Sequence, residues 1–193
     1  MQALTAMAMS NPNEPSTPAT ELAVSLPAVL FADISGSTML YEKLGDALAK
    51  TLVDECLDLM RTVTLRRGGR VIKSIGDELM CVFPDADRAS LAATDMQLEI
   101  SSLPAASGVR RALRIGMHAG PLLEEQDDVF GDTVNTAARM ASVARADQII
   151  TTMATVALMS PLLRASTRRI AALSVRGKGD DVEVCEVLWQ ASD

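Results

Sequence analysis

The chain is short of aromatic residues and has a single histidine. Aromatic side chains account for 3% of its 193 residues, so we expect a core of Leu, Val, Ile, Ala and the eleven Met residues. Structural zinc sites are built from several Cys and His ligands, so one histidine argues against such a site. His118 lies within an apolar stretch and is interpreted as a packed core residue rather than as a base.

The three cysteines form no CxxC pair. Cys56, Cys81 and Cys185 are far apart, and each lies in an apolar stretch, which predicts buried free thiols in a reducing compartment. The chain also lacks an apolar run of about 18 residues that could cross a membrane. Its start, residues 1–10, lacks the basic region of a signal peptide. We therefore expect a cytoplasmic protein that makes no contact with membranes.

Basic residues are outnumbered by acidic ones. The 18 Lys and Arg against 25 Asp and Glu give a net charge of −7 and a pI near 4.8. Such a chain has no general basic face for a nucleic acid, so no nucleic-acid partner is expected. A nucleoside triphosphate can still bind where metal ions mediate the contact.

A proline-containing start precedes a single folded domain. Pro12, Pro15 and Pro18 lie among Asn, Ser, Thr and Glu residues, a composition that buries too little surface to offset chain entropy. We expect residues 1–26 to form a flexible segment and residues 27–193 to form one domain.

Hydrophobic patterning predicts the first elements of that domain. The apolar run 28–32 is typical of a strand that is buried on both faces. A helix is expected over 39–65, with a possible break at Gly45 and an end at Gly68 and Gly69. Its buried stripe is expected to consist of Leu40, Leu44, Leu48, Leu52, Cys56 and Leu59.

The remaining elements complete a β-α-β-β-α-β order. This order favours an α+β fold with a ferredoxin-like core, C-terminal additions and an antiparallel-containing sheet flanked by helices. The predicted elements are a hairpin of strands 70–75 and 78–83 turning at Gly76-Asp77, a helix from Pro84 to about Leu103, a strand 114–119, an acidic loop 124–128, a helix 133–142, and strands 148–151 and 182–187.

Two aspartates are candidate metal ligands. Asp33 ends the first strand and Asp77 lies in the hairpin turn, so the intervening helix can return the chain and bring both to one edge of the sheet. Two carboxylates on rigid backbone suit Mg²⁺ or Mn²⁺ shared with a phosphate. The amides of Gly36, Ser37 and Thr38, at a helix start, can receive phosphate oxygens. The alternative is that Asp33 caps a helix and Asp77 serves only the turn.

Four stretches, in this order and spacing, resemble the class III adenylate/guanylate cyclase catalytic domain. The resemblance covers residues 27 to 189. It is carried by Phe31-Ala-Asp-Ile-Ser-Gly-Ser-Thr38, Lys73-Ser-Ile-Gly-Asp-Glu78, Arg114-Ile-Gly-Met-His-Ala-Gly120 and Phe130-Gly-Asp-Thr-Val-Asn-Thr-Ala-Ala-Arg139.

This resemblance implies an adenylate cyclase that works as a head-to-tail homodimer with two shared active sites. Asp33 and Asp77, with the backbone carbonyl of Ile34, would bind two Mg²⁺ or Mn²⁺ ions per site. ATP would be the substrate, with cyclic AMP and pyrophosphate as products. Near the C-terminal end, Arg176 or Lys178 occupies the place of a basic residue that contacts the terminal phosphates, and a solvated basic turn is the alternative there.

The partner subunit would supply the residues that read the base, Lys73 and Asp128. Lys73 can only donate hydrogen bonds and an ionised Asp128 can only accept them, which is complementary to N1 and the exocyclic amine of adenine. Guanine presents the reverse pattern. The alternatives are a solvated strand lysine and a slip of one residue that substitutes Asp127.

The partner would also supply Asn135 and Arg139, which act on the ribose and the α-phosphate. Four positions apart, they share one helix face, and a guanidinium suits a phosphate whose charge grows in the transition state. A surface polar pair is the alternative. The chain departs from many members in the short segment 120–130, which puts dimer affinity in doubt, and in Pro121, where some members have an arginine.

Two rival functions stand beside this one. Residues 75–79 faintly echo the signature loop of diguanylate cyclases, but Lys73 and the helix with Asn135 and Arg139 have no place there. The other rival is a module that binds nucleotide, or only dimerises, without turnover.

Overall fold

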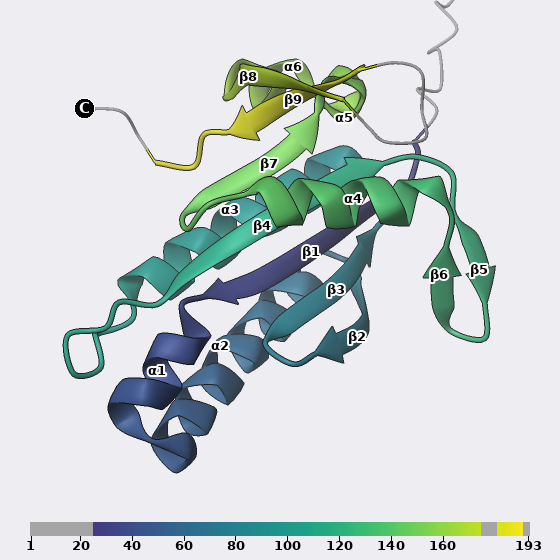
Figure 1. The fold of residues 1–193 in the computed structure, drawn as a ribbon. Coiled ribbons are helices and arrows are strands. Elements are labelled where there is room, and N and C mark those ends of the chain that lie inside the picture. The colour runs from purple at the N-terminus through teal and green to yellow at the C-terminus, as the bar shows by residue number, and fades with distance from the viewer. Residues whose placement is uncertain (1–24, 175–180, 191–193) are drawn as a thin grey trace, which may run out of the picture.

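A seven-stranded mixed sheet forms the centre of the molecule, with the strand order β2-β3-β1-β4-β7-β9-β8 (Figure 1). The computed structural model describes residues 25–174 and 181–190. Strands β4 and β7 are parallel, and the other neighbouring pairs are antiparallel. The strands are β1 (Ala28–Ser35), β2 (Arg70–Ile75), β3 (Glu78–Phe83), β4 (Ala112–Ala119), β7 (Gln148–Thr152), β8 (Thr167–Ser174) and β9 (Asp181–Val187).

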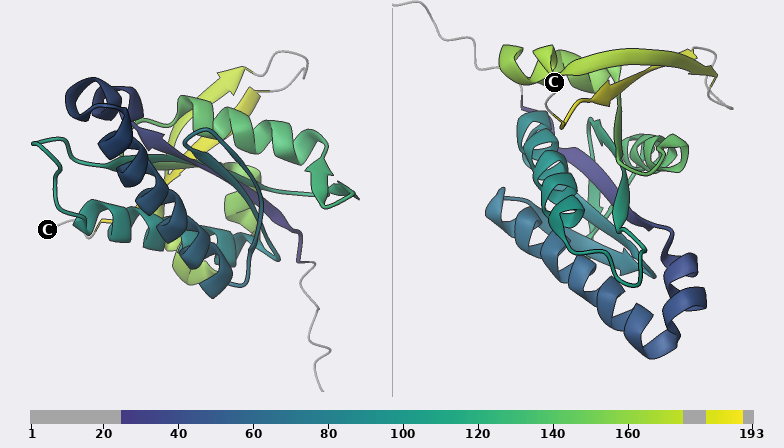
Figure 2. Two further views of the ribbon diagram at one scale, coloured as in Figure 1. Left: turned by 90° about the horizontal axis from the view of Figure 1, so that it is seen from below. Right: turned by 90° about the vertical axis from the view of Figure 1, so that its left-hand side faces the viewer.

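Helices cover both faces of this sheet. The long helices α2 and α3 lie on one face and α4 lies on the other, as Figures 1 and 2 show. A short helix, α1, extends beyond the end of β1, and α5 and α6 lie beside β8 and β9. The helices are α1 (Ser37–Leu44), α2 (Asp46–Arg66), α3 (Ala86–Ser102), α4 (Asp132–Val143), α5 (Met153–Leu158) and α6 (Pro161–Ala165).

Side chains of the central strand β1 alternate between the two layers. Ala28, Leu30 and Ala32 pack with α2 and α3. Val29 and Phe31 pack in a second cluster with α4. Because successive side chains of a strand point to opposite faces, Asp33 belongs to the α4 face.

The contact between α4 and the sheet depends on Gly116 of β4. A Cβ atom at this position would lie 1.8 Å from the backbone nitrogen of Ala141 on α4. The absent side chain therefore allows the helix to lie directly on the strand.

The predicted α+β fold, the β-α-β-β-α-β core and the helix break are confirmed. Gly45 separates α1 from α2 with a φ of 74°, and Gly68 and Gly69 follow the end of α2. The predicted stripe is confirmed at Leu40 and Cys56 but is wrong at Leu48, because α2 starts in a new phase after the break. Leu48 is 48% exposed, and Leu44, Leu52 and Leu59 are only partly buried. The residues of α2 that are buried are Ala49, Val53, Cys56, Leu57, Met60, Val63 and Thr64.

The acidic segment 124–128 is a β-hairpin rather than a loop. Its strands are β5 (Leu123–Glu125) and β6 (Asp128–Phe130), and Gln126 and Asp127 form the turn with φ of 49° and 67°. The helix predicted from Pro84 is α3, which starts at Ala86. Asp85 caps it by accepting a hydrogen bond from the backbone N–H of Arg88. Strand β8 and helices α5 and α6 were not predicted from the sequence.

The cysteines follow the prediction. Cys56, Cys81 and Cys185 are free and buried, and burial raises the pKa of Cys81 to about 12. Within residues 25–174 and 181–190, no helix is long and apolar enough to span a membrane. Of the flexible segment expected over residues 1–26, positions 1–24 lie outside the described residues.

Candidate active site

Asp33 lies near the end of β1 between two charged neighbours. Its Cα partners across the sheet are Glu78 on β3 and Arg114 on β4. Partners in register point to the same face of a sheet, so all three side chains lie on the α4 face. The side chain of Asp33 is only 13% exposed.

Asp77 is brought to the same end of the sheet by the β2–β3 turn. The backbone N–H of Ile34 donates a hydrogen bond of 3.3 Å to the carbonyl oxygen of Asp77, which joins the end of β1 to this turn. Burial raises the pKa of Asp33, Arg114 lowers it through a hydrogen bond and its charge, and the charge of Asp77 raises it. The two aspartates that are widely separated in sequence are therefore near each other.

Glu78 adds a third carboxylate to this region. The pKa of Glu78 is raised, mainly by burial and then by the charges of Asp33 and Asp77, while the charge of Arg114 acts in the opposite direction. No role was predicted from the sequence for Glu78 or Arg114. Only the cross-strand register, which depends on the tertiary fold, shows that both flank Asp33.

Gly36 joins β1 to α1, and the first backbone N–H groups of α1 make no hydrogen bond within the helix. Gly36 is the N-cap with a φ of 80°, and the first bond of the helix runs from the N–H of Leu40 to the carbonyl of Gly36. The N–H groups of Ser37 and Thr38 precede that bond, so they are the orphan donors of a helix start. Asp33 is not the cap of this helix, which removes the structural alternative for that residue.

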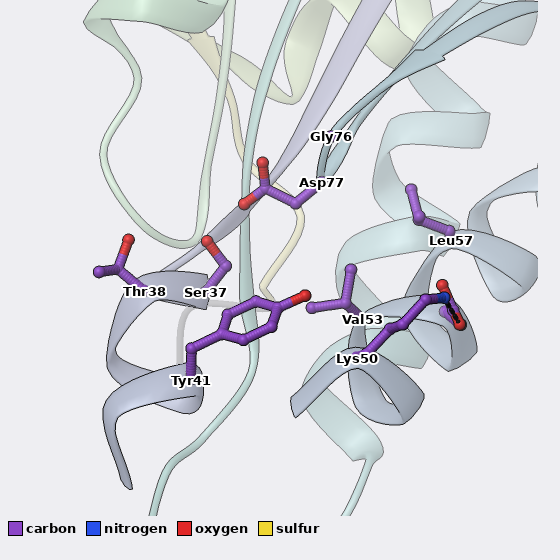
Figure 3. A pocket seen from close by; sticks show the side chains of 9 residues that line it. Ser37, Thr38, Tyr41, Lys50, Val53, Leu57, Gly76 and Asp77 are labelled. Carbon is purple, nitrogen blue, oxygen red and sulfur yellow. Dashed lines mark hydrogen bonds and ion pairs between the residues drawn. The ribbon is translucent and has the colours of Figure 1, made fainter. Parts of the chain in front are cut away.

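A cavity of about 510 Å³ opens beside these groups. It lies between α1, α2 and the β2–β3 turn, with Asp77 on one side and Lys50 of α2 on another (Figure 3). Lys50 pairs with Asp54 across one turn of α2 at 2.5 Å. The cavity is lined by Ser37, Thr38, Tyr41, Lys50, Val53, Asp54, Leu57, Gly76 and Asp77.

The chemistry of these donors fits Mg²⁺ or Mn²⁺. Among the described residues, no three or more His, Cys, Asp or Glu side chains are grouped so as to hold a metal ion by themselves. Asp33 and Asp77 carry hard carboxylate oxygens, and the charge of Asp77 raises the pKa of Asp33, so a divalent cation between them would relieve this repulsion. Two carboxylates also leave coordination positions for phosphate oxygens and water, as Mg²⁺ prefers.

Lys73 and Asp128 meet although they are distant in sequence. Lys73 of β2 and Asp128 of β6 form an ion pair of 2.6 Å. The hydrogen bond from Lys73, joined by one from the backbone N–H of Val129, holds the pKa of Asp128 below its usual value. Asp127 lies in the hairpin turn instead, so the structure selects Asp128 as the partner of Lys73. A second ion pair, Arg70 with Glu124 at 2.8 Å, also joins β2 to the hairpin.

The comparison with known families agrees with this arrangement. The family described as the adenylate and guanylate cyclase catalytic domain matches residues 24–185 of the chain. The protein belongs to this family.

Curated relatives of this cyclase domain include bacterial adenylate cyclases. An adenylate cyclase of Streptomyces coelicolor is 32% identical over 123 residues, which cover 64% of this chain and 31% of the relative. An adenylate cyclase of Glutamicibacter nicotianae is 29% identical over 157 residues, which cover 79% of this chain and 37% of the relative. The chain thus spans about a third of the length of these curated relatives.

A solved structure has the same fold. The catalytic core of a rhodopsin-guanylyl cyclase with converted specificity, in complex with ATPαS, superimposes with a TM-score of 0.76 at 25% identity. The match covers 84% of this chain and 95% of that structure.

Asn135 and Arg139 lie on α4 of the cyclase domain, whose first turn is at the opposite end of β4 from Asp33. Asn135 is exposed and Arg139 is half-buried, one helical turn further on. The start of α4 lies at the far end of β4, where the hydroxyl of Thr133 donates a hydrogen bond of 2.7 Å to the carbonyl of Pro121. Asp33 instead pairs with Arg114 at the beginning of β4. One chain therefore does not bring Asn135 to its own Asp33.

Three further residues complete the comparison with the sequence predictions. Arg176 and Lys178 lie outside the described residues. His118 is half-buried and its Nδ1 lies 2.8 Å from the hydroxyl of Thr152 and 3.1 Å from that of Thr155. These contacts hold the imidazole in place, but its partial exposure means that His118 is not one of the fully buried core residues.

Proposed function

We propose that this cyclase domain converts ATP into 3′,5′-cyclic AMP and pyrophosphate. The observation that carries the choice of ATP is the ion pair of Lys73 with Asp128. A donor beside an acceptor is complementary to the acceptor N1 and the donor amine of adenine, whereas guanine presents the opposite order. The adenylate cyclases among its relatives support the same choice.

The catalytic unit is a head-to-tail homodimer with two shared sites. Support for this comes from the separation of Asn135, in the first turn of α4, from Asp33 within one chain. A second copy, turned by a two-fold axis, would bring its α4 to the aspartates of the first. Lys73 and Asp128 would come from the same copy as α4.

In each site, Asp33, Asp77 and the carbonyl of Ile34 would hold two Mg²⁺ or Mn²⁺ ions. Metals held there would lower the pKa of the ribose 3′-hydroxyl and would offset the charge of the triphosphate. The N–H groups of Ser37 and Thr38, with Gly36 before them, receive phosphate oxygens. Arg176 or Lys178 would contact the terminal phosphates.

The reaction is an in-line displacement at the α-phosphorus. A bond forms between the 3′-oxygen and the α-phosphorus, the bond to the bridging oxygen of the β-phosphate breaks, and the hydroxyl proton passes to solvent. Asn135 orients the ribose, and the guanidinium of Arg139 stabilises the charge that grows on the α-phosphate. Positioning and electrostatics therefore supply most of the rate.

A side-by-side assay tests the proposal. The chain is incubated with Mn²⁺ and either ATP or GTP, at concentrations high enough to populate dimers, and products are identified by mass spectrometry. We expect cyclic AMP from ATP at a much higher kcat/KM than cyclic GMP from GTP. Equal use of both nucleotides would overturn the choice of ATP, a cyclic dinucleotide from GTP would indicate a diguanylate cyclase, and no turnover would indicate a binding module.

A further inference from the structure

Arg114 contacts Asp33 through only one of the two carboxylate oxygens. Both its Nε, at 2.8 Å, and its Nη2 donate hydrogen bonds to the same carboxylate oxygen, Oδ2. A guanidinium paired with a carboxylate frequently uses both oxygens, one for each nitrogen. Here the second oxygen, Oδ1, receives no hydrogen bond from Arg114.

The two partners differ in freedom. The side chain of Asp33 is 13% exposed, whereas that of Arg114 is 44% exposed. Asp33 is also fixed by its place on the central strand, between β3 and β4. The contact therefore restricts the rotation of the Asp33 carboxylate about its Cβ–Cγ bond, because the two hydrogen bonds hold Oδ2 on the side of β4.

The charge of Arg114 also acts on the rest of this region. Asp33, Asp77 and Glu78 are three carboxylates at one end of the sheet, and the guanidinium of Arg114 interacts with both Asp33 and Glu78. A positive charge at this place offsets their mutual repulsion. The same charge repels any cation that binds to Asp33.

We propose that Arg114 is a positioning residue of the cyclase reaction, which holds Oδ2 of Asp33 and so directs Oδ1 toward the metal. Its charge at the same time weakens the binding of that metal. The proposal rests on the proposed function in one respect, namely that Asp33 is a metal ligand. Arg114 itself touches neither metal nor nucleotide in this arrangement.

Orientation and charge can be separated by two substitutions. Arg114→Gln removes the charge and the fork, so we expect Mn²⁺ to bind about fivefold to tenfold more tightly while kcat falls about tenfold or more. Arg114→Lys keeps the charge but not the fork, since an ammonium has no second nitrogen in a fixed plane. Because the charge is kept, we expect Arg114→Lys to bind Mn²⁺ with an affinity within about twofold of wild type. Its kcat should fall about as much as that of Arg114→Gln, because the fork is lost in both variants.

The sheet offers a matched control in Arg168. It is the Cα partner of Glu186 on β9, and its Nε donates a hydrogen bond of 2.8 Å to that carboxylate. Arg168→Gln removes a comparable cross-strand ion pair at the β8 edge of the sheet, away from the central strands β1 and β4. It should leave both Mn²⁺ affinity and kcat unchanged.

The experiment uses the full chain and two readouts. Mn²⁺ binding without nucleotide is measured by electron paramagnetic resonance of the free ion, and kcat is measured with saturating Mn²⁺ and ATP. Tighter binding with a lower kcat in Arg114→Gln supports the proposal. Binding that is not tighter, or a kcat within twofold of wild type, overturns it.

Two additional variants keep the test decisive. If Arg114→Gln does not fold, Arg114→Lys decides, because a wild-type kcat in that variant overturns the positioning role and a low kcat at unchanged Mn²⁺ affinity supports it. Asp33→Asn should lose Mn²⁺ binding, and retained binding would remove the basis of the proposal. A wild-type chain without cyclase activity would contradict the proposed function, while the Mn²⁺ measurements would still test the charge effect of Arg114.

Discussion

Lys73 and Asp128 are 55 positions apart in the sequence, and their side chains form an ion pair of 2.6 Å between β2 and the β5–β6 hairpin. The pair is partly exposed, so it contributes little to the stability of the fold. Exposed ion pairs of this kind are weak, and a ligand that offers its own donor and acceptor can replace the contact. The relationship therefore matters for recognition more than for folding.

Asp128→Asn should reduce the selectivity for ATP over GTP. The amide keeps the shape of the carboxylate but is neutral and can donate as well as accept, so the preference for the adenine amine weakens. We expect the ratio of kcat/KM for ATP to that for GTP to fall about tenfold to a hundredfold, which corresponds to one or two hydrogen bonds. Glu125→Gln is the control, because Glu125 is the exposed Cα partner of Asp128 in the hairpin. An unchanged ratio in Asp128→Asn would assign base recognition to other residues.

Asp95 should make the stability of the domain depend on pH in the acidic range. Burial alone would raise its pKa, but hydrogen bonds from Arg67 and Arg66 outweigh this and lower it. A carboxylate whose pKa is lower in the folded state stabilises the fold at pH values above its unfolded pKa, here 3.8. This stabilisation is lost as the pH falls through the folded pKa.

We therefore expect Asp95→Asn to destabilise the domain at pH 7, by about 1 kcal/mol, and to differ little from wild type at the lowest pH at which both fold. Urea unfolding at a series of pH values checks this. Asp58→Asn is the control, since the pair of Asp58 with Arg61 lies on the exposed side of α2. A deficit that stays constant down to the acid limit would show that Asp95 acts through packing instead of charge.

Gly116→Ala should displace α4 from the sheet. The new Cβ would lie 1.8 Å from the backbone nitrogen of Ala141, and backbone atoms cannot yield as a side-chain end can. We expect a loss of about 3 kcal/mol or more in the free energy of unfolding, at the upper end of overpacking effects. Gly108→Ala provides the comparison, because that site is open and has only a positive φ of 77° to resist the change. It should cost about 1–2 kcal/mol, and equal losses in both variants would mean that α4 adjusts easily.

The core of the fold could be predicted because its signals are local. The apolar run of β1, the glycines after α2 and the turn at Gly76-Asp77 each determine their own element. The hairpin β5–β6 was missed because its turn uses Gln126 and Asp127 at positive φ, where a glycine or asparagine would have given a signal. The stripe of α2 was misplaced because one glycine resets the helical phase.

The residues of the site also fall into those that local sequence could predict and those that it could not. Asp33 and Asp77 were predicted from their places after a strand and in a turn, and Lys73 and Asp128 from a family resemblance with complementary hydrogen bonding. Arg114 and Glu78 were missed as neighbours of Asp33, because their register in β4 and β3 is set by long-range pairing. Local sequence shows which residues can carry the chemistry, and the sheet determines which of them touch.

Removal of either aspartate should abolish cyclase activity without unfolding the domain. Asp33→Ala and Asp77→Ala each delete a hard oxygen ligand, so we expect kcat to fall by about a hundredfold or more. The two carboxylates repel each other. Removing one of them should therefore change the free energy of unfolding of the metal-free domain only slightly. Circular dichroism and urea unfolding provide the structural control. Near-full activity in either variant would remove that residue from the metal site.

Mixed protomers give the sharpest test of the shared site. In a head-to-tail dimer, one site takes Asp77 from the first protomer and Arg139 from the second, and the other site takes the reverse. A dimer of Asp77→Ala with Arg139→Ala therefore keeps one site with both residues intact. Random mixing makes half of the dimers mixed, so about a quarter of the wild-type activity should return.

The control mixes Asp33→Ala with Asp77→Ala. Both residues lie at the same end of one chain, so each protomer spoils the site to which it contributes metal ligands, and no activity should return. Heterodimers are verified by two different affinity tags and by native mass spectrometry. Recovery in the first mixture but not in the second requires that aspartates and arginine come from different chains. Silence in both mixtures, with heterodimers present, would place Arg139 and Asp77 in the same chain or outside the site, because a shared site cannot remain inactive when one copy of it is complete.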